Sequence, residues 1–476
     1  MPQQTLYDEI PYTSFPHSPS HPDQLATVAF LHGLDPPAVA TCRVLELGCG
    51  AGANLLGMAY GLPGARLIGL DLAPSAIEEA SSDARALGLN NVEFEVTDVR
   101  DVSARGLGEF DYVIAHGLYA WIDHDAREAL LATCAAHLAP NGIAYVSFNT
   151  HPGGHFRRSL RELALWHTRN DEDPAQRAQR SRELFASLRS LRDESDPWGG
   201  LLAAELPELS VAPTDHLVHD LLNEDWEPVW FADFAGAAQR SGLQYVGEAS
   251  VHRITGPWEP EVEKELWRLA EGDRIAYQQL VDFMVWRRFR DSLLCHAGRE
   301  VSDHIDHSRL RALRFRPSGP LAEQDVPTRE ILPTLAANSP QPVQFDQLRV
   351  ELAADPDQLS EALLDLARRG RVTMHLEPPP LGDADLVRPR VTALARRQAI
   401  GGSFCTTLFG GIVRLDGTVI RTLLTLTDGS RDREQIRAEI ARTSGTALPP
   451  QQLDAALHDL AAMGLLEPTP AAPQPG

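Results

Sequence analysis

Residues 43–54, RVLELGCGAGAN, decide the fold of this chain. The apolar run 43–47 predicts a strand, and it is followed by three closely spaced glycines, Gly48, Gly50 and Gly52, before a helical stretch. Glycines let the backbone turn tightly and allow a ligand to approach the peptide groups without interference from a Cβ atom. A strand, a glycine-rich turn and a helix in this order predict the ligand-binding edge of an α/β sheet.

The residues on either side of this motif alternate between strand and helix patterns. Strand-like runs occupy 65–71, 92–96, 110–115 and 142–148, and helical stretches occupy 53–60, 75–87 and 125–138. This alternation predicts βαβ units and a parallel sheet, that is, a Rossmann-like, doubly wound α/β fold. We assign residues 36–155 to this core.

The segments that flank the core differ from it in composition and in their pattern of apolar residues. Residues 1–35 combine many prolines with aromatic residues, which predicts an extended arm able to close over a site, followed by a short helix at 21–34. A solvated terminus is the alternative.

Residues 156–315 predict a helical regulatory or substrate domain, in which 231–251 could add strands to the core sheet. Within it, the basic-aromatic run 286–290 is interpreted as part of an amphipathic helix.

The C-terminal third holds an internal repeat, 359–372 and 453–466. Each copy predicts an amphipathic helix that ends at a glycine, Gly370 or Gly464, before a short apolar stretch. This pattern predicts two winged-helix-like modules, 328–390 and 400–468, after a linker at 316–327. Both repeat regions are net acidic, which favours a protein partner over DNA.

Three acidic residues follow or end predicted strands. Glu46 can accept hydrogen bonds from a cationic amino group, Asp71 can accept both hydroxyls of a ribose, and Asp98 can receive the amine of an adenine. An amino-acid tail, a ribose and an adenine together describe S-adenosylmethionine (SAM). The glycine motif alone also fits a dinucleotide, and acids occur at the strand ends of many α/β sheets, so both alternatives stay open.

From this pattern we predict where the cofactor and the transferred methyl group lie. SAM and its product S-adenosylhomocysteine should bind at Glu46, Gly48, Cys49, Gly50, Gly52, Asp71, Leu72, Asp98, Val99 and His116. The candidates for the catalytic site are Tyr7, Tyr12, His116, Tyr119 and Trp121. Tyr119 and Trp121 could flank a cation by cation–π contact, or they could pack in the core under the following helix.

Five longer segments carry a family resemblance: 7–34, 116–123, 147–154, 223–234 and 286–296. They resemble a bacterial subgroup of class I SAM-dependent methyltransferases with a methyltransferase regulatory domain. With the C-terminal repeat, the whole chain resembles the protein-lysine methyltransferases typified by rickettsial enzymes that modify outer-membrane protein. The resemblance implies SAM as cofactor and an amine acceptor on a protein lysine. A small-molecule methyltransferase is the alternative, and a winged-helix DNA-binding regulator is a weaker one.

Composition limits the functional classes further. Lys and Arg number 43 against 66 Asp and Glu, a net charge of −23, so neither a nucleic acid nor a membrane is expected as partner. The 5 cysteines form no C-x-x-C pair and no H-E-x-x-H set occurs, so no metal is expected. Without a signal-like N-terminus or an apolar run of about 18 residues, we expect a cytoplasmic location.

Overall fold

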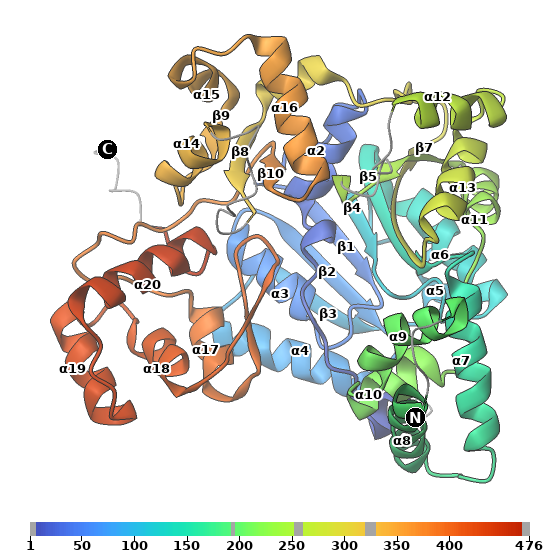
Figure 1. The fold of residues 1–476 in the computed structure, drawn as a ribbon, viewed down its shortest axis with the longest axis horizontal. Coiled ribbons are helices and arrows are strands. Elements are labelled where there is room, and N and C mark those ends of the chain that lie inside the picture. The colour runs from blue at the N-terminus through green and yellow to red at the C-terminus, as the bar shows by residue number, and fades with distance from the viewer. Residues whose placement is uncertain (1–5, 192–195, 252–259, 319–329, 469–476) are drawn as a thin grey trace.

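A seven-stranded sheet forms the centre of the molecule in the computed structural model, which describes residues 6–191, 196–251, 260–318 and 330–468 (Figure 1). The strand order is β3-β2-β1-β4-β5-β7-β6. The strands are β1 (Arg43–Leu47), β2 (Arg66–Asp71), β3 (Val92–Val96), β4 (Phe110–Ala115), β5 (Leu138–Asn149), β6 (Leu243–Glu248) and β7 (Phe289–His296). The first five are parallel to one another, as predicted, and β7 runs antiparallel to both β5 and β6.

Helices cover both faces of this sheet because successive strand residues point to opposite sides. Val44 packs into a cluster with helices α2 (Pro22–Leu31) and α3 (Ala53–Gly61), whereas Leu45 packs into a cluster with α6 (His124–His137) and α11 (Phe231–Arg240). Helix α4 (Pro74–Leu87) contributes to the first cluster. The doubly wound α/β fold predicted from the sequence is confirmed.

The prediction that residues 286–290 lie in an amphipathic helix is wrong. Helix α13 (Arg274–Val285) ends at Trp286, whose φ of 53° is left-handed, and the chain then enters β7. Strand β7 lies between β5 and β6 and is buried on both faces, so its apolar and charged residues do not alternate. Periodicity alone does not separate such a strand from a buried helix. The suggestion that 231–251 adds a strand to the core is confirmed by β6.

A helical layer follows β5 and has its own apolar cluster around Phe156, Phe185 and Leu206. It consists of α7 (Gly154–His167), α8 (Pro174–Leu191), α9 (Pro197–Leu209), α10 (Thr214–His216) and the π-helical turn η2 (Leu217–Leu221). Helix α12 (Pro260–Leu269) precedes α13. Figure 1 shows this layer beside the N-terminal segment.

The C-terminal third forms two units. The first contains β8 (Arg314–Pro317), α14 (Ile331–Ala337), β9 (Val343–Gln344), α15 (Phe345–Glu351), α16 (Pro356–Arg368) and β10 (Val372–His375). The second contains α17 (Ala393–Gly401), β11 (Phe404–Thr406), β12 (Ile412–Arg414), α18 (Thr418–Leu426), α19 (Arg433–Ser444) and α20 (Pro450–Ala462). The repeated helices α16 and α20 are followed by Gly370 and Gly464 at φ values of 66° and 73°. The order of elements differs between the units, and their winged-helix character stays a prediction.

The first C-terminal unit begins earlier than predicted and is not separate from the core. Arg316 and Pro317 of the predicted linker belong to β8, which pairs with β10, while residues 319–327 lie outside the described residues. Leu363 and Leu364 of α16 belong to the same apolar cluster as α2 and α3. His375 Nδ1 also lies 2.7 Å from Asp23 Oδ2 of α2. In the described parts of the chain, no helix is both long and apolar enough to cross a membrane.

Candidate active site

The glycine-rich loop after β1 is held against the neighbouring strand β2. Gly48, Gly50 and Gly52 all have left-handed φ values, 73°, 53° and 74°. The Gly48 amide donates to the Leu70 carbonyl at 2.8 Å, and the Gly50 amide donates to Asp71 Oδ2 at 2.8 Å. A Cβ atom at Gly52 would lie 2.8 Å from the Phe94 ring. Both the backbone angles and the close packing therefore require glycine in this loop.

Glu46 presents a buried carboxylate at the base of the loop. Its side chain is 3% exposed, and Oε1 accepts a hydrogen bond from Asn54 Nδ2 at 2.7 Å. Oε2 is buried without a hydrogen-bond partner in the part of the chain that the structure describes. Burial raises the pKa of Glu46 to about 8. At neutral pH the ligand-free group is therefore mainly protonated, and a cationic amino group bound at the unpartnered Oε2 would favour its ionised form.

The acids at the ends of β2 and β3 lie nearby. Asp71 accepts from Ala73 N at 2.9 Å in addition to Gly50 N, and burial raises its pKa. Asp98 caps α5 (Val99–Val102) by accepting from Arg100 N at 2.9 Å, and it pairs with the Arg100 guanidinium at 3.0 Å. Exposed Leu72 lies next to Asp71 in the chain. The sheet thus gathers these side chains along one edge, where α/β folds bind ligands.

These residues line a cavity of about 940 Å³ at the carboxyl ends of the parallel strands. The residues predicted to bind the cofactor that line it are Glu46, Gly48, Cys49, Gly50, Asp71, Leu72, Asp98, Val99 and His116. Gly52 does not line the cavity and instead allows close packing against Phe94. Among the catalytic candidates, Tyr7, Tyr12, His116 and Trp121 face the cavity.

The structure excludes Tyr119 from the cavity wall. Its side chain is 4% exposed and packs against Phe148 and Phe234, with ring centroids 5.8 and 5.2 Å away. Arg127 lies over its ring and donates to its carbonyl at 2.8 Å. The structure therefore places Tyr119 in the core, as the packing alternative expected, with its ring between Phe148 of β5 and Phe234 of α11.

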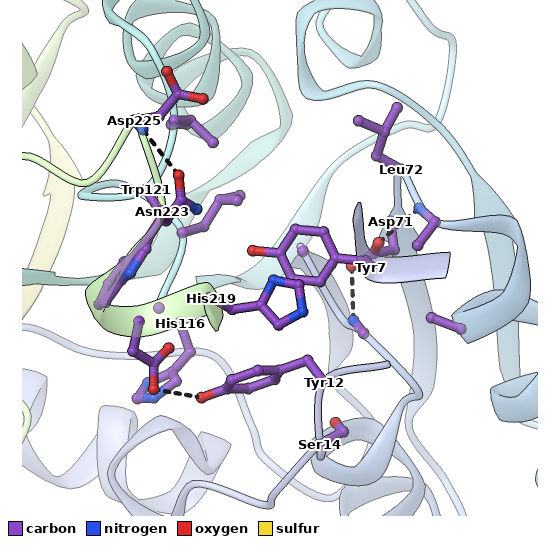
Figure 2. Close-up of a pocket in the computed structure, with 18 of the residues that line it drawn as sticks. Tyr7, Tyr12, Ser14, Asp71, Leu72, His116, Trp121, His219, Asn223 and Asp225 are labelled. Carbon is purple, nitrogen blue, oxygen red and sulfur yellow. Dashed lines mark hydrogen bonds between the residues drawn. The ribbon is translucent and has the colours of Figure 1, made fainter. Parts of the chain in front are cut away.

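The N-terminal arm closes one side of the cavity (Figure 2). The ring of Tyr7, in the short helix α1 (Leu6–Glu9), stacks on His219 with centroids 4.1 Å apart. Tyr12 Oη donates to Asp220 Oδ2 at 3.3 Å, and His219 Nε2 donates to the Ile10 carbonyl at 2.6 Å. The arm is thus attached to the π-helical turn η2, about two hundred residues away in the sequence.

His116 stands where the arm meets the end of β4. Its Nδ1 lies 2.9 Å from Tyr145 Oη and 3.1 Å from Ser147 Oγ, which fix the ring. The His17 ring stacks on it at 3.4 Å, and burial lowers the pKa of His17 to about 4. His17 is therefore neutral at physiological pH, and this part of the cavity gains no positive charge from it.

The wall that faces the strand ends was not predicted from the sequence. That wall includes His219, Asp220 and Trp226 from the region after α10, together with Arg157 and Phe289. The one local signal is that His216, His219 and Asp220 interrupt an apolar stretch at helical spacing. Their approach to the cavity depends on contacts with the arm, and no local pattern encodes such contacts.

The sheet order, with a cavity beside the glycine-rich loop after β1, defines a class I methyltransferase fold. Comparison with known families agrees. Residues 44–142 match the family described as "Methyltransferase domain", and residues 213–296 match "Predicted methyltransferase regulatory domain". Both the strand-end wall and the wall that carries His219 and Asp220 therefore fall within family matches.

Individual relatives extend the comparison. Uncharacterized protein RP789 of Rickettsia prowazekii (strain Madrid E) is 34% identical over 326 residues, which are 67% of this chain and 58% of the relative. Uncharacterized protein RP028 of the same strain is 31% identical over 49% of this chain and 94% of the relative. Trans-aconitate 2-methyltransferase of Deinococcus radiodurans is 31% identical over 121 residues, 25% of this chain and 42% of the relative. This chain therefore spans 58% of the length of RP789 but nearly all of RP028.

Solved structures show the same architecture over nearly the whole chain. PKMT2 from Rickettsia typhi superposes with a TM-score of 0.82 at 25% identity, covering 96% of this chain and 100% of that one. Its complex with S-adenosylhomocysteine (AdoHcy) gives the same TM-score at 24% identity. The chain belongs to the class I SAM-dependent methyltransferases that carry a methyltransferase regulatory domain.

Proposed function

We propose that this chain transfers a methyl group from SAM to an amine on a protein, the side chain of a lysine. The observation that carries the proposal is the cavity itself, which joins a cofactor edge to a second wall of aromatic and acidic residues. When bound, SAM supplies an electrophilic methyl group on a sulfonium. The resemblance to rickettsial protein-lysine methyltransferases, and the likeness to PKMT2 over 96% of the chain, support this assignment.

The residues along the strand ends fit this cofactor. The unpartnered Oε2 of Glu46 would accept the amino group of the amino-acid tail, Asp71 would accept the ribose hydroxyls, and Asp98 would accept the adenine amine. The AdoHcy complex of PKMT2 supports a cofactor of this kind here. The glycine loop leaves its peptide groups accessible between these acids.

The residues of the chain contribute chiefly alignment and exclusion of water. Methyl transfer is an in-line displacement, so the nucleophile must be held on the line from the methyl carbon to the sulfur. The arm covers the cavity with the rings of Tyr7 and Tyr12, which shield it from bulk solvent. A lysine has an ordinary pKa of about 10.4, and a desolvated pocket favours its neutral, nucleophilic form.

A small-molecule acceptor is the second candidate, favoured by the likeness to trans-aconitate 2-methyltransferase. That likeness covers 25% of this chain. Arginines also line the cavity, but the carboxylates of Asp220, Glu224 and Asp225 on this wall would repel a carboxylate-rich acceptor that bound beside them. The same wall suits a cationic amine.

The test is incubation of the protein with trideuteromethyl SAM and a bacterial lysate, followed by mass spectrometry of proteins and metabolites. We expect heavy methyl groups on lysine Nε atoms, absent when the Glu46→Gln variant replaces the wild type. Label confined to small molecules would support the second candidate and contradict the proposal.

A further inference from the structure

The second wall of the cavity holds a carboxylate that the cofactor does not account for. Asp220 lies in the π-helical turn η2 and lines the cavity. Turns of this kind are rare and often occur at functional sites. Figure 2 shows Tyr7 between Asp71 on the cofactor side and His219, the neighbour of Asp220, on the other.

Other carboxylates of the cavity are engaged or face bulk water. Those with hydrogen-bonded or ion-paired partners are Glu46, Asp71, Asp98, Asp123 and Glu208. Those on the exposed surface are Glu79, Glu224 and Asp225. Asp220 differs because it is partly buried and uses only Oδ2, which accepts from Tyr12. Its Oδ1 accepts no hydrogen bond from the described residues.

The groups around Asp220 leave its carboxylate ionised and do not pair it with a counter-ion. Burial raises its pKa to about 6, so the carboxylate is ionised at neutral pH. The titratable and charged groups that face it are Asp215 and His216 on its own segment, Tyr12 on the arm and Arg157 on α7. Arg157 is already paired with Glu205 at 2.8 Å and Glu208 at 3.2 Å. A cation bound at Asp220 would therefore meet a carboxylate that lacks a dedicated counter-ion.

Aromatic rings complete this environment. The Tyr12 ring lies 5.3 Å from that of His216 and 5.8 Å from that of His219, and Tyr7 stacks on His219. Tyrosine faces attract cations, and ring walls exclude water from a charged pair. The site thus combines one open carboxylate oxygen with a partly apolar wall.

We propose that Asp220 docks the ammonium group of the methyl acceptor and is the residue that selects an amine. The inference deepens the proposed function and rests on it. On binding, an ammonium donates to Oδ1 while Tyr12 donates to Oδ2, and the docked amine must release its proton to water before its neutral form attacks the methyl carbon. A neutral or anionic acceptor gains nothing from this arrangement and leaves a partly buried charge without a partner.

The experiment is calorimetric titration of the full-length protein, saturated with AdoHcy, with the peptide acetyl-Gly-Lys-Gly-amide at pH 7.5. Asp220→Asn should weaken peptide binding by about tenfold or more, the loss expected for a charge-assisted hydrogen bond. Asp215→Asn is the matched control because Asp215 also accepts from the arm, from Thr13 N at 2.9 Å, but does not line the cavity. Its peptide affinity should stay within about threefold of wild type.

Two further readouts separate charge recognition from a structural role. Wild-type affinity for the peptide should fall as the pH drops through about 6, where Asp220 takes up a proton, and Asp220→Asn should lose this dependence. The same peptide acetylated on the lysine should not bind. Asp220→Glu keeps the carboxylate and should recover part of the affinity, and AdoHcy binding reports that each variant is folded.

The inference is overturned if wild type and Asp220→Asn bind the lysine peptide with equal affinity. It is also overturned if wild type binds the acetylated peptide as tightly as the lysine peptide, or does not bind the lysine peptide at all. The proposed function has its own test: it is contradicted if the lysate experiment finds no heavy methyl group on any lysine. Heavy methyl groups on lysine combined with an unaffected Asp220→Asn variant would remove only the role of Asp220.

Discussion

The ring of Tyr7 lies parallel to the imidazole of His219, with centroids 4.1 Å apart and an interplanar angle of 11°. This stack joins the N-terminal arm to the regulatory-domain wall across the cavity. Because Tyr7 is 39% exposed, its ring covers the mouth of the cavity and is not part of the hydrophobic core. The arm therefore has the placement of a lid, and its role in turnover can be tested.

Tyr7→Ala should reduce methyl transfer by about tenfold, because loss of the ring opens the cavity to water and loosens acceptor alignment. AdoHcy affinity should stay within a few-fold of wild type. Tyr7→Phe keeps the stacked ring and should retain most of the turnover. Steady-state kinetics with the acceptor found in the lysate would check both, and equal losses in the two variants would assign the effect to the hydroxyl instead.

Asp71→Ala should weaken AdoHcy binding at least tenfold by calorimetry, because charge-assisted hydrogen bonds to ribose hydroxyls contribute about 1.5–3 kcal/mol. Asp71 also holds the Gly50 amide at 2.8 Å, so the loop loses an anchor in the same variant. Asp101→Ala, on an exposed position of α5, is the control and should leave AdoHcy affinity unchanged. Unchanged affinity in Asp71→Ala with an intact fold would remove Asp71 from the site.

The buried ion cluster on β7 should be essential for folding. Arg290 is 0% exposed and pairs with Glu248 of β6 and with Asp282 of α13, the latter at 2.8 Å. Arg290→Met removes the guanidinium that pairs with buried Glu248 and one of the two that pair with Asp282, which also contacts Arg287, and should cost about 3–5 kcal/mol of unfolding free energy. Urea denaturation measures this loss. Arg268→Ala, which breaks an exposed pair with Glu265, should leave the unfolding midpoint unchanged.

Removal of residues 318–476 should expose the apolar surface of α2 and α3 that Leu363 and Leu364 cover. We expect the truncated protein to aggregate or to melt at a markedly lower temperature, because large apolar surfaces lose their burial. If the two C-terminal units folded independently of the core, the truncated protein would instead stay stable and keep normal AdoHcy affinity. Thermal melting of the truncated and full-length proteins decides between these outcomes.

The sequence predicted the parts of the fold that follow from local periodicity. Strands such as 43–47 and 92–96, and the acids Glu46, Asp71 and Asp98 at their ends, were found because parallel strands end at one edge of a sheet. Strand β7 was missed because the charged residues Arg290 and Asp291 lie inside it. They are buried there through partners distant in the sequence, such as Asp282 of α13 for Arg290 and Ser250 for Asp291. The Asp220 wall was missed because it is formed by contacts of the arm with a distant turn.

Glu46 gives the most direct test that this cavity is the cofactor site of a methyltransferase. Burial raises its folded-state pKa from an ordinary 4.5 to about 8, so it destabilises the ligand-free protein increasingly as the pH rises from 4.5 to 8. Glu46→Gln should therefore stabilise the ligand-free protein by about 1–3 kcal/mol at pH 8 and by almost nothing below pH 4.5. The same variant removes the charge that we expect to hold the cofactor amino group.

The decisive measurement is calorimetric titration of AdoHcy into wild type and Glu46→Gln at pH 8, with thermal melting of the ligand-free proteins. We predict that the variant melts at a higher temperature yet binds AdoHcy at least tenfold more weakly, because a buried charge-assisted hydrogen bond is lost. Unchanged AdoHcy affinity in a folded Glu46→Gln protein would contradict the assignment of this cavity to SAM.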